Sequence, residues 1–272
     1  MGRVSERLRV ERSGPGGVVA RVTLARPEVH NAFDASLIAD LAAVFGGLGR
    51  EGPATLRAVV LAGDGPTFCA GADLAWMRAA TQLDVEANEQ DAMAMAELFD
   101  TIDTCPVPVI ARVQGAALGG GMGLCAVADL VIAESGARFG FTETRLGLLP
   151  ATIAPFVIAK IGESNARALF PGGRRFDAMR AQRIGLVHEI VEGEAALDAA
   201  VDATITDVLA AGPTAARAAK AIVREVRGLG HGATKWHTAR TIARQRVSAE
   251  AREGFEAFEG KRRPAWAPDE DG

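Results

Sequence analysis

The sequence has few cysteines and no long hydrophobic run. Its 272 residues contain only Cys69, Cys105 and Cys125, which are far apart and form no Cys-x-x-Cys pair. Three separated cysteines indicate neither a disulfide framework nor a zinc site, and we expect buried, reduced thiols. No 18 consecutive residues are apolar, and the charged start MGRVSERLRV does not read as a secretory signal. We therefore expect a cytoplasmic protein without a membrane partner.

Several motifs that would assign a function are also missing. The sequence has no Gly-x-Ser-x-Gly elbow of a serine hydrolase, and no Gly-Lys-[Ser/Thr] follows its glycine cluster, as a P-loop requires. A dinucleotide-binding G-x-G-x-x-G starting at Gly119 fails, because Leu124 stands at the third glycine position. The four histidines lack the spacing of metal ligands, so we expect no metal. A formal net charge of −4 argues against a nucleic-acid partner.

What is present is an alternation of short apolar strands and amphipathic helices, which predicts an α/β protein. The segment RAVVLAG, residues 57–63, is a continuous apolar run typical of a strand buried on both faces. Asp34 is placed to cap a helix over residues 35–48, and a long helix is predicted over residues 85–104. Further strands are predicted at 7–14, 17–26, 108–115, 128–135 and 137–141, and a helix at 151–162. After about residue 192 the sequence is alanine-rich and helical.

Two loops rich in glycine and alanine follow two of the predicted buried strands. They are FCAGADL, residues 68–74, and ALGGGMG, residues 117–123. Small side chains leave backbone N–H groups uncovered, and the second loop opens a helix, whose N-terminus is the positive end of its dipole. Two converging donors of this kind stabilise a developing oxyanion. An alternative reading, in which the glycines only allow tight strand-to-helix packing, stays open at this point.

Three longer motifs occur in order along the chain: FCAGADLAWM, PVIARVQGAALGGGMGL and ARFGFTETRLGLLP. Together with RPEVHNAF near the start and FEAFEGKRRPAW near the end, they resemble the enoyl-CoA hydratase/isomerase (crotonase) superfamily over nearly the whole chain. The resemblance implies a crotonase (ClpP/crotonase-like) fold, an α/β spiral core of β-β-α units with a helical C-terminal region. It implies an acyl-CoA thioester as substrate, but not one reaction, because this superfamily runs many chemistries on one scaffold.

The resemblance also assigns the residues that would hold the acyl group. The backbone N–H groups of Ala72 and of Gly120, the middle glycine of the triplet, would form the oxyanion hole around the thioester carbonyl. Ala70, Asp73 and Leu74 would line the path of the CoA moiety. Coenzyme A would arrive as part of the substrate, so no dissociable cofactor is expected.

Other CoA contacts are implied at the two ends of the chain. The loop that begins at Arg26 is similar to the one that flanks CoA in the family. Phe255 and Lys261 lie in a segment that resembles one lending side chains to CoA, sometimes across a subunit boundary. Helix packing for Phe255 and a solvated charge for Lys261 are equally compatible roles.

Glu143 is the predicted catalytic acid and base. Hydratases that resemble this chain carry two glutamates, and Glu143 matches the second of them. The first would stand three residues after the oxyanion glycine, where this sequence has Gly123. Glu97 and Asp100 are the candidates that could replace the missing acid, although a solvated helix face explains both more simply.

The reaction that we predict is reversible addition of water to a 2-enoyl-CoA. A bacterial subgroup acting on methylglutaconyl-CoA and related branched or glutaconyl thioesters resembles this chain in GGGxGL and in the segment ATIAP. Arg145 could pair with the second carboxylate of such a substrate, while a surface or salt-bridge role is the simpler reading. A Δ3-Δ2 enoyl-CoA isomerase, with Glu143 as its single proton shuttle, is the alternative.

We predict a crotonase spiral core over residues 1–195 and a C-terminal helical oligomerisation region over residues 196–272. The resemblance implies a homotrimer or a homohexamer. An alternative of another class is a non-catalytic relative that binds acyl-CoA or RNA. For RNA the arginines of the C-terminal region would supply the contacts, but they are interleaved with glutamates such as Glu253 and Glu256, which favours a salt-bridged helix surface.

Overall fold

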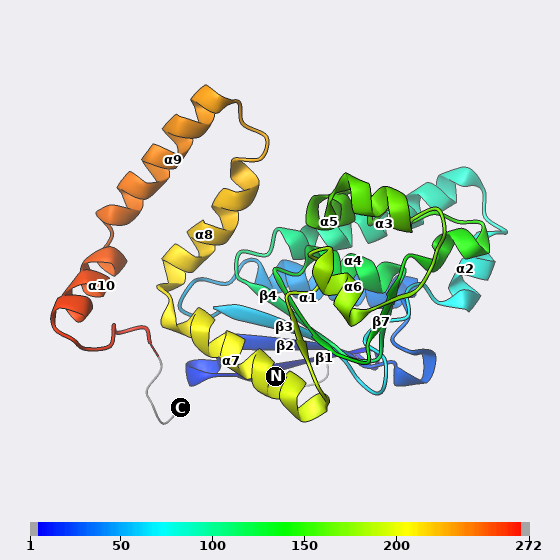
Figure 1. Ribbon diagram of the computed structural model, residues 1–272, viewed down its shortest axis with the longest axis horizontal. Helices are drawn as coiled ribbons and strands as arrows, with labels where there is room; N and C mark the ends of the chain where they lie inside the picture. Colours follow the sequence, from blue (N-terminus) through cyan, green and yellow to red (C-terminus); the bar gives the residue numbers. More distant parts are fainter. Residues whose placement is uncertain (1–4, 268–272) are drawn as a thin grey trace.

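The computed structural model describes residues 5–267, which form two sheets covered by helices (Figure 1). One sheet has six strands in the order β1-β2-β3-β4-β6-β9, and β5, β7 and β8 form the other. β1 and β2 are an antiparallel hairpin, whereas all later neighbours in the large sheet run parallel. The strands are β1 (Leu8–Ser13), β2 (Val19–Leu24), β3 (Ala58–Gly63), β4 (Val109–Val113), β5 (Ala116–Leu118), β6 (Leu130–Glu134), β7 (Arg138–Gly140), β8 (Phe176–Asp177) and β9 (Glu189–Val191).

Several helices begin where the sequence places a capping side chain. The carboxylates of Asp34, Asp73, Asp84 and Asp177 each accept a backbone N–H from the first turn of the following helix. The helices are α1 (Ala35–Leu48), α2 (Leu74–Ala80), α3 (Val85–Asp103), α4 (Gly120–Val127), α5 (Ala154–Leu169), α6 (Ala178–Arg183), α7 (Glu194–Ala210), α8 (Pro213–Glu225), α9 (His231–Arg246) and α10 (Ala249–Glu259). Three 3₁₀ helices cover Pro15–Gly17, Pro27–Val29 and Thr142–Leu146.

The large sheet is buried on both faces. All six residues of β3 are buried, as its continuous apolar run predicts. One face packs into the main core with α1, α3 and α4. The other face is covered by α7, whose Leu197, Val201 and Leu209 pack against residues such as Val60 and Ile110. This arrangement leaves the ends of the parallel strands free to carry the site.

The last three helices form an arm that leaves the core (Figure 1). Glu250 of α10 caps α8, because its carboxylate accepts the backbone N–H groups of Thr214 and Ala215 at 2.8 Å each. At the base of the arm, the buried Arg57 side chain donates hydrogen bonds to the carbonyl oxygens of Trp266 (2.7 Å) and Leu209 (2.8 Å). The arm therefore starts after α7, and its helices are linked to one another and to the core by these hydrogen bonds. The division of the chain at residues 195 and 196 stays a prediction.

Candidate functional site

The two glycine-rich loops meet at the carboxyl ends of β3 and β4. Cys69 and Ala117 form a parallel bridge, with Leu118 donating its N–H to the Cys69 carbonyl at 3.0 Å. The contact is close enough to require glycine: a Cβ added to Gly71 would come within 2.9 Å of the Leu118 carbonyl oxygen and 3.4 Å of the Gly120 nitrogen. Gly71 also has φ +93°, which favours glycine. The segments that carry Ala72 and Gly120 are therefore in van der Waals contact.

Both predicted oxyanion donors are free. Phe33 donates its N–H to the Gly71 carbonyl (2.7 Å) and accepts from Asp73 (2.8 Å), so the N–H of the intervening Ala72 is left out of this bridge. Gly120 is the first residue of α4, where backbone N–H groups have no partner inside the helix. Within residues 5–267, neither the Ala72 nor the Gly120 N–H has a hydrogen-bond acceptor. Two unpaired amide donors on touching segments are suited to bind one oxygen atom.

The Glu143 carboxyl lies against these loops. Glu143 belongs to the 3₁₀ helix Thr142–Leu146, and a Cβ placed on Gly119 would be 3.5 Å from its Oε1. Its Oε2 is buried without a hydrogen-bond partner in the described part of the chain. Burial raises the pKa of the Glu143 carboxyl, against a smaller opposite effect of its own backbone N–H. A desolvated carboxyl with a free oxygen is suited to accept and return a proton.

Hydrogen bonds on both sides hold the 3₁₀ helix Thr142–Leu146 in place and so position the Glu143 carboxyl. The carbonyl of Glu143 accepts the N–H of Leu148 at 3.1 Å, and the Thr144 hydroxyl donates to the Phe170 carbonyl at 3.1 Å. On the other side, Gly119 donates its N–H to the Gly140 carbonyl at 3.0 Å, just before this helix. A backbone hydrogen bond therefore joins the loop at residues 117–123 to the strand that leads into the 3₁₀ helix of Glu143.

The position of the missing first glutamate is filled by apolar side chains. Gly123 lies inside α4, and a Cβ there would meet the Phe99 ring at 2.7 Å and the Ile153 side chain. Both side chains are fully or almost fully buried. The slot therefore has no room for an acid or for the water that it would hold.

The candidate replacement acids do not reach this slot. Glu97 and Asp100 are exposed, because α3 buries Met95, Leu98, Phe99 and Ile102 instead. Arg145 is also exposed, on the solvent side of the 3₁₀ helix. Glu143 is consequently the carboxylate that the structure brings to the two amides.

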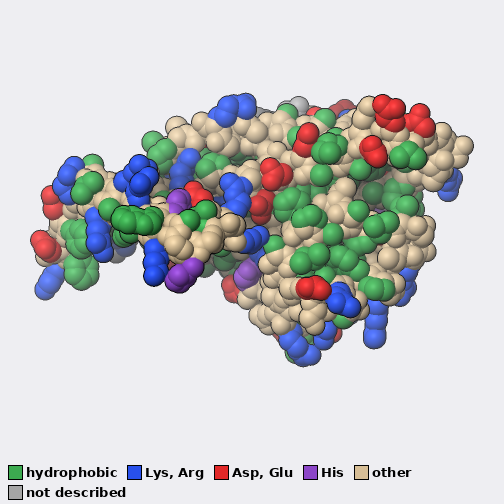
Figure 2. All heavy atoms as spheres, turned by 90° about the horizontal axis from the view of Figure 1, so that it is seen from above, with side chains coloured by type: hydrophobic (Ala, Val, Ile, Leu, Met, Phe, Trp, Pro, Cys, Tyr) green, Lys and Arg blue, Asp and Glu red, His purple; other side chains and the backbone are tan. Residues whose placement is uncertain are grey.

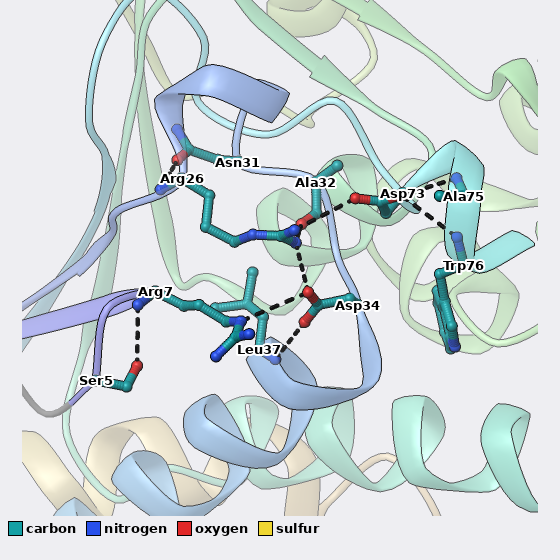
Figure 3. A network of polar contacts seen from close by, with 10 residues as sticks. All are labelled: Ser5, Arg7, Arg26, Asn31, Ala32, Asp34, Leu37, Asp73, Ala75 and Trp76. Carbon is teal, nitrogen blue, oxygen red and sulfur yellow. Dashed lines mark hydrogen bonds and ion pairs between the residues drawn. The ribbon is translucent and has the colours of Figure 1, made fainter.

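Arg26 lies in a network that joins two helix N-termini (Figure 3). Its guanidinium, whose side chain is 14% exposed, contacts Asp34 Oδ2 at 3.0 Å and Asp73 Oδ2 at 3.3 Å. It also donates to the Ala32 carbonyl at 2.6 Å. Asp34 caps α1, and Asp73 caps α2 through the N–H groups of Ala75 and Trp76. Arg26 and Asp73 thus hold the loop around Ala72 in place through their own side chains.

The other predicted CoA contacts are placed differently. Ala70 is half-buried and donates its N–H to the His30 carbonyl at 3.0 Å, and Leu74 is exposed at the start of α2. Phe255 and Lys261 are exposed at the end of the arm, which Figure 1 shows on the opposite side of the molecule from α2. One chain therefore does not bring Phe255 and Lys261 to Ala72 and Gly120.

Residues important to the site were not predicted from the sequence. Phe99 and Ile153 close the slot at Gly123, yet both read as ordinary core residues. Asn31 is buried with φ +55°, and its side chain binds the Arg26 N–H and the Thr67 carbonyl. The available signal was Asp34, which the sequence places as a helix cap and which is able to pair with Arg26.

The chain is similar in sequence and in fold to known proteins. Residues 15–269 match the family model for enoyl-CoA hydratase/isomerase. The chain is 34% identical over 233 residues to enoyl-CoA hydratase ACTT6 of Alternaria alternata, covering 84% of this chain and 76% of that protein. Among solved structures, an enoyl-CoA hydratase from Shewanella pealeana has a TM-score of 0.88 with 37% identity over 96% of both chains. Pseudomonas aeruginosa AtuE has a TM-score of 0.91 with 38% identity, over 96% of this chain and 100% of its own.

Proposed function

Because the chain belongs to the enoyl-CoA hydratase/isomerase family, we propose that it adds water reversibly to a 2-enoyl-CoA with Glu143 as the only carboxylate. The observation that carries the proposal is the juxtaposition of two unpaired backbone N–H groups with a desolvated carboxyl whose Oε2 has no partner. The N–H groups of Ala72 and Gly120 would bind the thioester oxygen. Glu143 would face the α and β carbons.

One carboxylate is sufficient for this reaction. The Glu143 carboxylate takes a proton from water while the water oxygen forms a bond to the β-carbon. The electron pair of the double bond moves through the α-carbon to the thioester oxygen, where the two N–H groups stabilise the enolate. When the carbonyl reforms, Glu143 returns its proton to the α-carbon, and the carboxylate is regenerated. One hydrogen of the added water therefore ends on the α-carbon, and the other stays in the β-hydroxyl group.

We also propose how the CoA moiety is bound. Ala70, Asp73 and Leu74 would line its path, with Arg26 acting through Asp73, since its guanidinium is engaged inside the protein. Phe255 and Lys261 would reach the site of a neighbouring copy in a homotrimer or homohexamer, because in one chain α10 lies far from α4 (Figure 1). The core at 1–195 and the oligomerisation region at 196–272 belong to the same proposal. Coenzyme A enters as part of the substrate, without a separate cofactor.

The closed slot at Gly123 favours a second candidate, isomerisation of a 3-enoyl-CoA to a 2-enoyl-CoA. Phe99 and Ile153 occupy the space where a second acid and its water would stand. In this reaction Glu143 removes a proton from the α-carbon and delivers it to the γ-carbon, so no water is consumed. The same two amides would stabilise the dienolate.

Isotope-labelled water distinguishes the two reactions. The purified chain would be incubated with straight and branched 2-enoyl-CoA and 3-enoyl-CoA esters in H₂¹⁸O, and products analysed by mass spectrometry. Hydration incorporates ¹⁸O at the β-carbon, whereas isomerisation moves the double bond without label. Glu143→Gln is the control and should lower kcat/KM by about 10²- to 10⁴-fold while the CoA ester still binds. Unchanged esters with every substrate would contradict both candidates.

A further inference from the structure

A cavity of about 730 Å³ lies between α8 and the core, and Glu143 is not among its lining residues. One wall consists of the ends of α3 and α4 and the start of α5, and the other is α8. Its volume is within the range of small-molecule sites, about 300–1,000 Å³.

The face that α8 turns toward this cavity is basic. Arg217, Lys220 and Arg224 are three or four residues apart on α8, so they share one side of the helix, and Arg227 follows in the turn after it. All four line the cavity. The core adds Lys160 together with the carboxylates of Asp103 and Asp129. Five cationic side chains thus face two anionic ones.

The two lysines of this cavity already form hydrogen bonds within the protein. The Lys160 ammonium donates to the Ala128 carbonyl at 2.6 Å. Lys220 donates to Asp129 Oδ2 at 2.6 Å and to the Val107 carbonyl at 3.0 Å. Both ammonium groups therefore satisfy core oxygens and balance Asp129.

The arginines of this cavity have fewer polar contacts within the described residues than the lysines. A terminal N–H of Arg217 donates to the Leu56 carbonyl at 2.9 Å, while the N–H at Nε is buried without an acceptor in the described residues. Arg224 and Arg227 are exposed and form no ion pair with any residue of the range 5–267. The remaining carboxylate, Asp103, is half-buried and offsets at most one of these positive charges. The cavity thus retains uncompensated positive charge.

We propose that this cavity is a second ligand site, which binds a small molecule carrying a phosphate or pyrophosphate group. Guanidinium groups donate paired N–H bonds that match phosphate oxygens. Arg224 and Arg227 are close in the turn that ends α8, where the Arg227 N–H donates to the Arg224 carbonyl at 3.2 Å. Phe156, Val223 and Ala221 supply apolar walls for the rest of the ligand. The proposal does not depend on the reaction at Glu143.

The second site lies directly behind the oxyanion hole. α4 begins at Gly120 and ends at residues that line the cavity, Ala126 and Val127. The Phe156 ring in the cavity wall is 6.1 Å from the ring of Phe99, which lies against Gly123. A bound ligand would contact the same layer of side chains that packs against Gly123 in α4.

Isothermal titration calorimetry with inorganic pyrophosphate at low salt tests the proposal on the full chain. We expect saturable binding that Arg224→Gln/Arg227→Gln weakens at least about tenfold, because two charge-assisted contacts are lost. The matched control is Arg240→Gln/Arg244→Gln, which removes the same charge from exposed positions of α9 outside the cavity and should change the affinity by less than about twofold.

A variant that is expected to bind pyrophosphate more tightly separates a specific effect on the site from loss of folding. Asp103→Asn removes a carboxylate from the cavity and should tighten pyrophosphate binding. Equal weakening in both arginine pairs would show non-specific charge attraction and overturn the site. Absence of saturable binding to the unmodified chain would overturn it too, as would a crystal structure with a second copy of the chain filling the cavity.

Discussion

The carboxyl of Glu143 combines burial with the absence of a partner for Oε2. Because burial raises its pKa, the carboxylate form needed to accept a proton is lost at a higher pH than for an ordinary glutamate. We expect the acidic limb of the kcat/KM profile to have its midpoint above about 4.3, the ordinary pKa of glutamate. A limb at or below that value would contradict the desolvated environment.

The same group affects stability in a defined direction. Its pKa is raised in the folded state, so its contribution is favourable below the unfolded pKa and is lost as pH rises through the folded pKa. Glu143→Gln, measured by calorimetry, should therefore raise Tm at pH 8 more than at pH 4. The opposite order would show that the folded protein stabilises the charged carboxylate.

Gly123 offers a test of the closed slot. Gly123→Ala would force a Cβ against the Phe99 ring and Ile153, and should destabilise the protein by about 1–3 kcal/mol in urea unfolding. Gly47→Ala is the matched control, since Gly47 is also helical but has nothing within 4 Å of an added Cβ. It should be neutral or stabilising by up to about 1 kcal/mol. Equal stability of the two variants would show that the slot is open.

At the scale of elements, Arg26 joins the N-termini of α1 and α2 through their capping carboxylates. Arg26→Met should lower the free energy of unfolding by about 3 kcal/mol, because it leaves the partly buried Asp73 without a cation and Asp34 with only the longer contact to Arg7. It should also raise KM for the CoA ester, since Ala72 directly precedes the cap Asp73. Arg7→Met is the control: its contact with Asp34 is longer, at 3.6 Å, and more exposed. Its cost should stay below about 1 kcal/mol.

Most elements could be predicted because their signals are local. The hairpin of β1 and β2, the Asp34 cap and the buried run of β3 are confirmed by the structure. The short helix α2 was not predicted, because seven residues after a loop carry too little periodicity, although Asp73 is its cap. β5 was hidden inside the glycine-rich segment. Its parallel pairing with β7 depends on a crossover through α4 and β6 that no local pattern records.

The site was predictable to a similar degree. The sequence motifs led to Ala72, Gly120 and Glu143, which the structure brings together. They could not indicate that Phe99 and Ile153 fill the space beside Gly123, since those residues come from distant elements. Nor could they show that the Arg26 guanidinium is engaged inside the protein, because that contact depends on how two loops fold over each other.

At the scale of the whole molecule, the arm exposes apolar surface beside its charges. Figure 2 shows hydrophobic as well as Lys and Arg side chains on the arm that extends from the core. On α10, Phe258 is 83% exposed and Phe255 67% exposed, and the two rings are three residues apart on one side of the helix. In residues 5–267, no helix is both long enough and apolar enough to span a membrane. A second copy of the chain is the partner that we propose for this surface.

Sedimentation velocity tests that proposal. The unmodified chain should sediment as a trimer or hexamer, and Phe255→Ser/Phe258→Ser should shift it toward the monomer without loss of helical content. Val85→Ser, which removes a similarly exposed apolar side chain from α3, should leave the assembly intact. A monomeric unmodified chain would contradict the proposed assembly and, with it, the contribution of Phe255 and Lys261 to a neighbouring site.

The most direct test of the account is the infrared spectrum of a bound substrate whose thioester carbonyl carries ¹³C. The measurement would use Glu143→Gln, so that the ester persists, and compare the carbonyl stretch in solution with that in the complex. If the Ala72 and Gly120 amides donate hydrogen bonds to the thioester oxygen, the C=O bond is weakened and the carbonyl band moves to lower frequency on binding. A carbonyl band at its solution frequency in a fully formed complex would show that these amides do not bind the thioester.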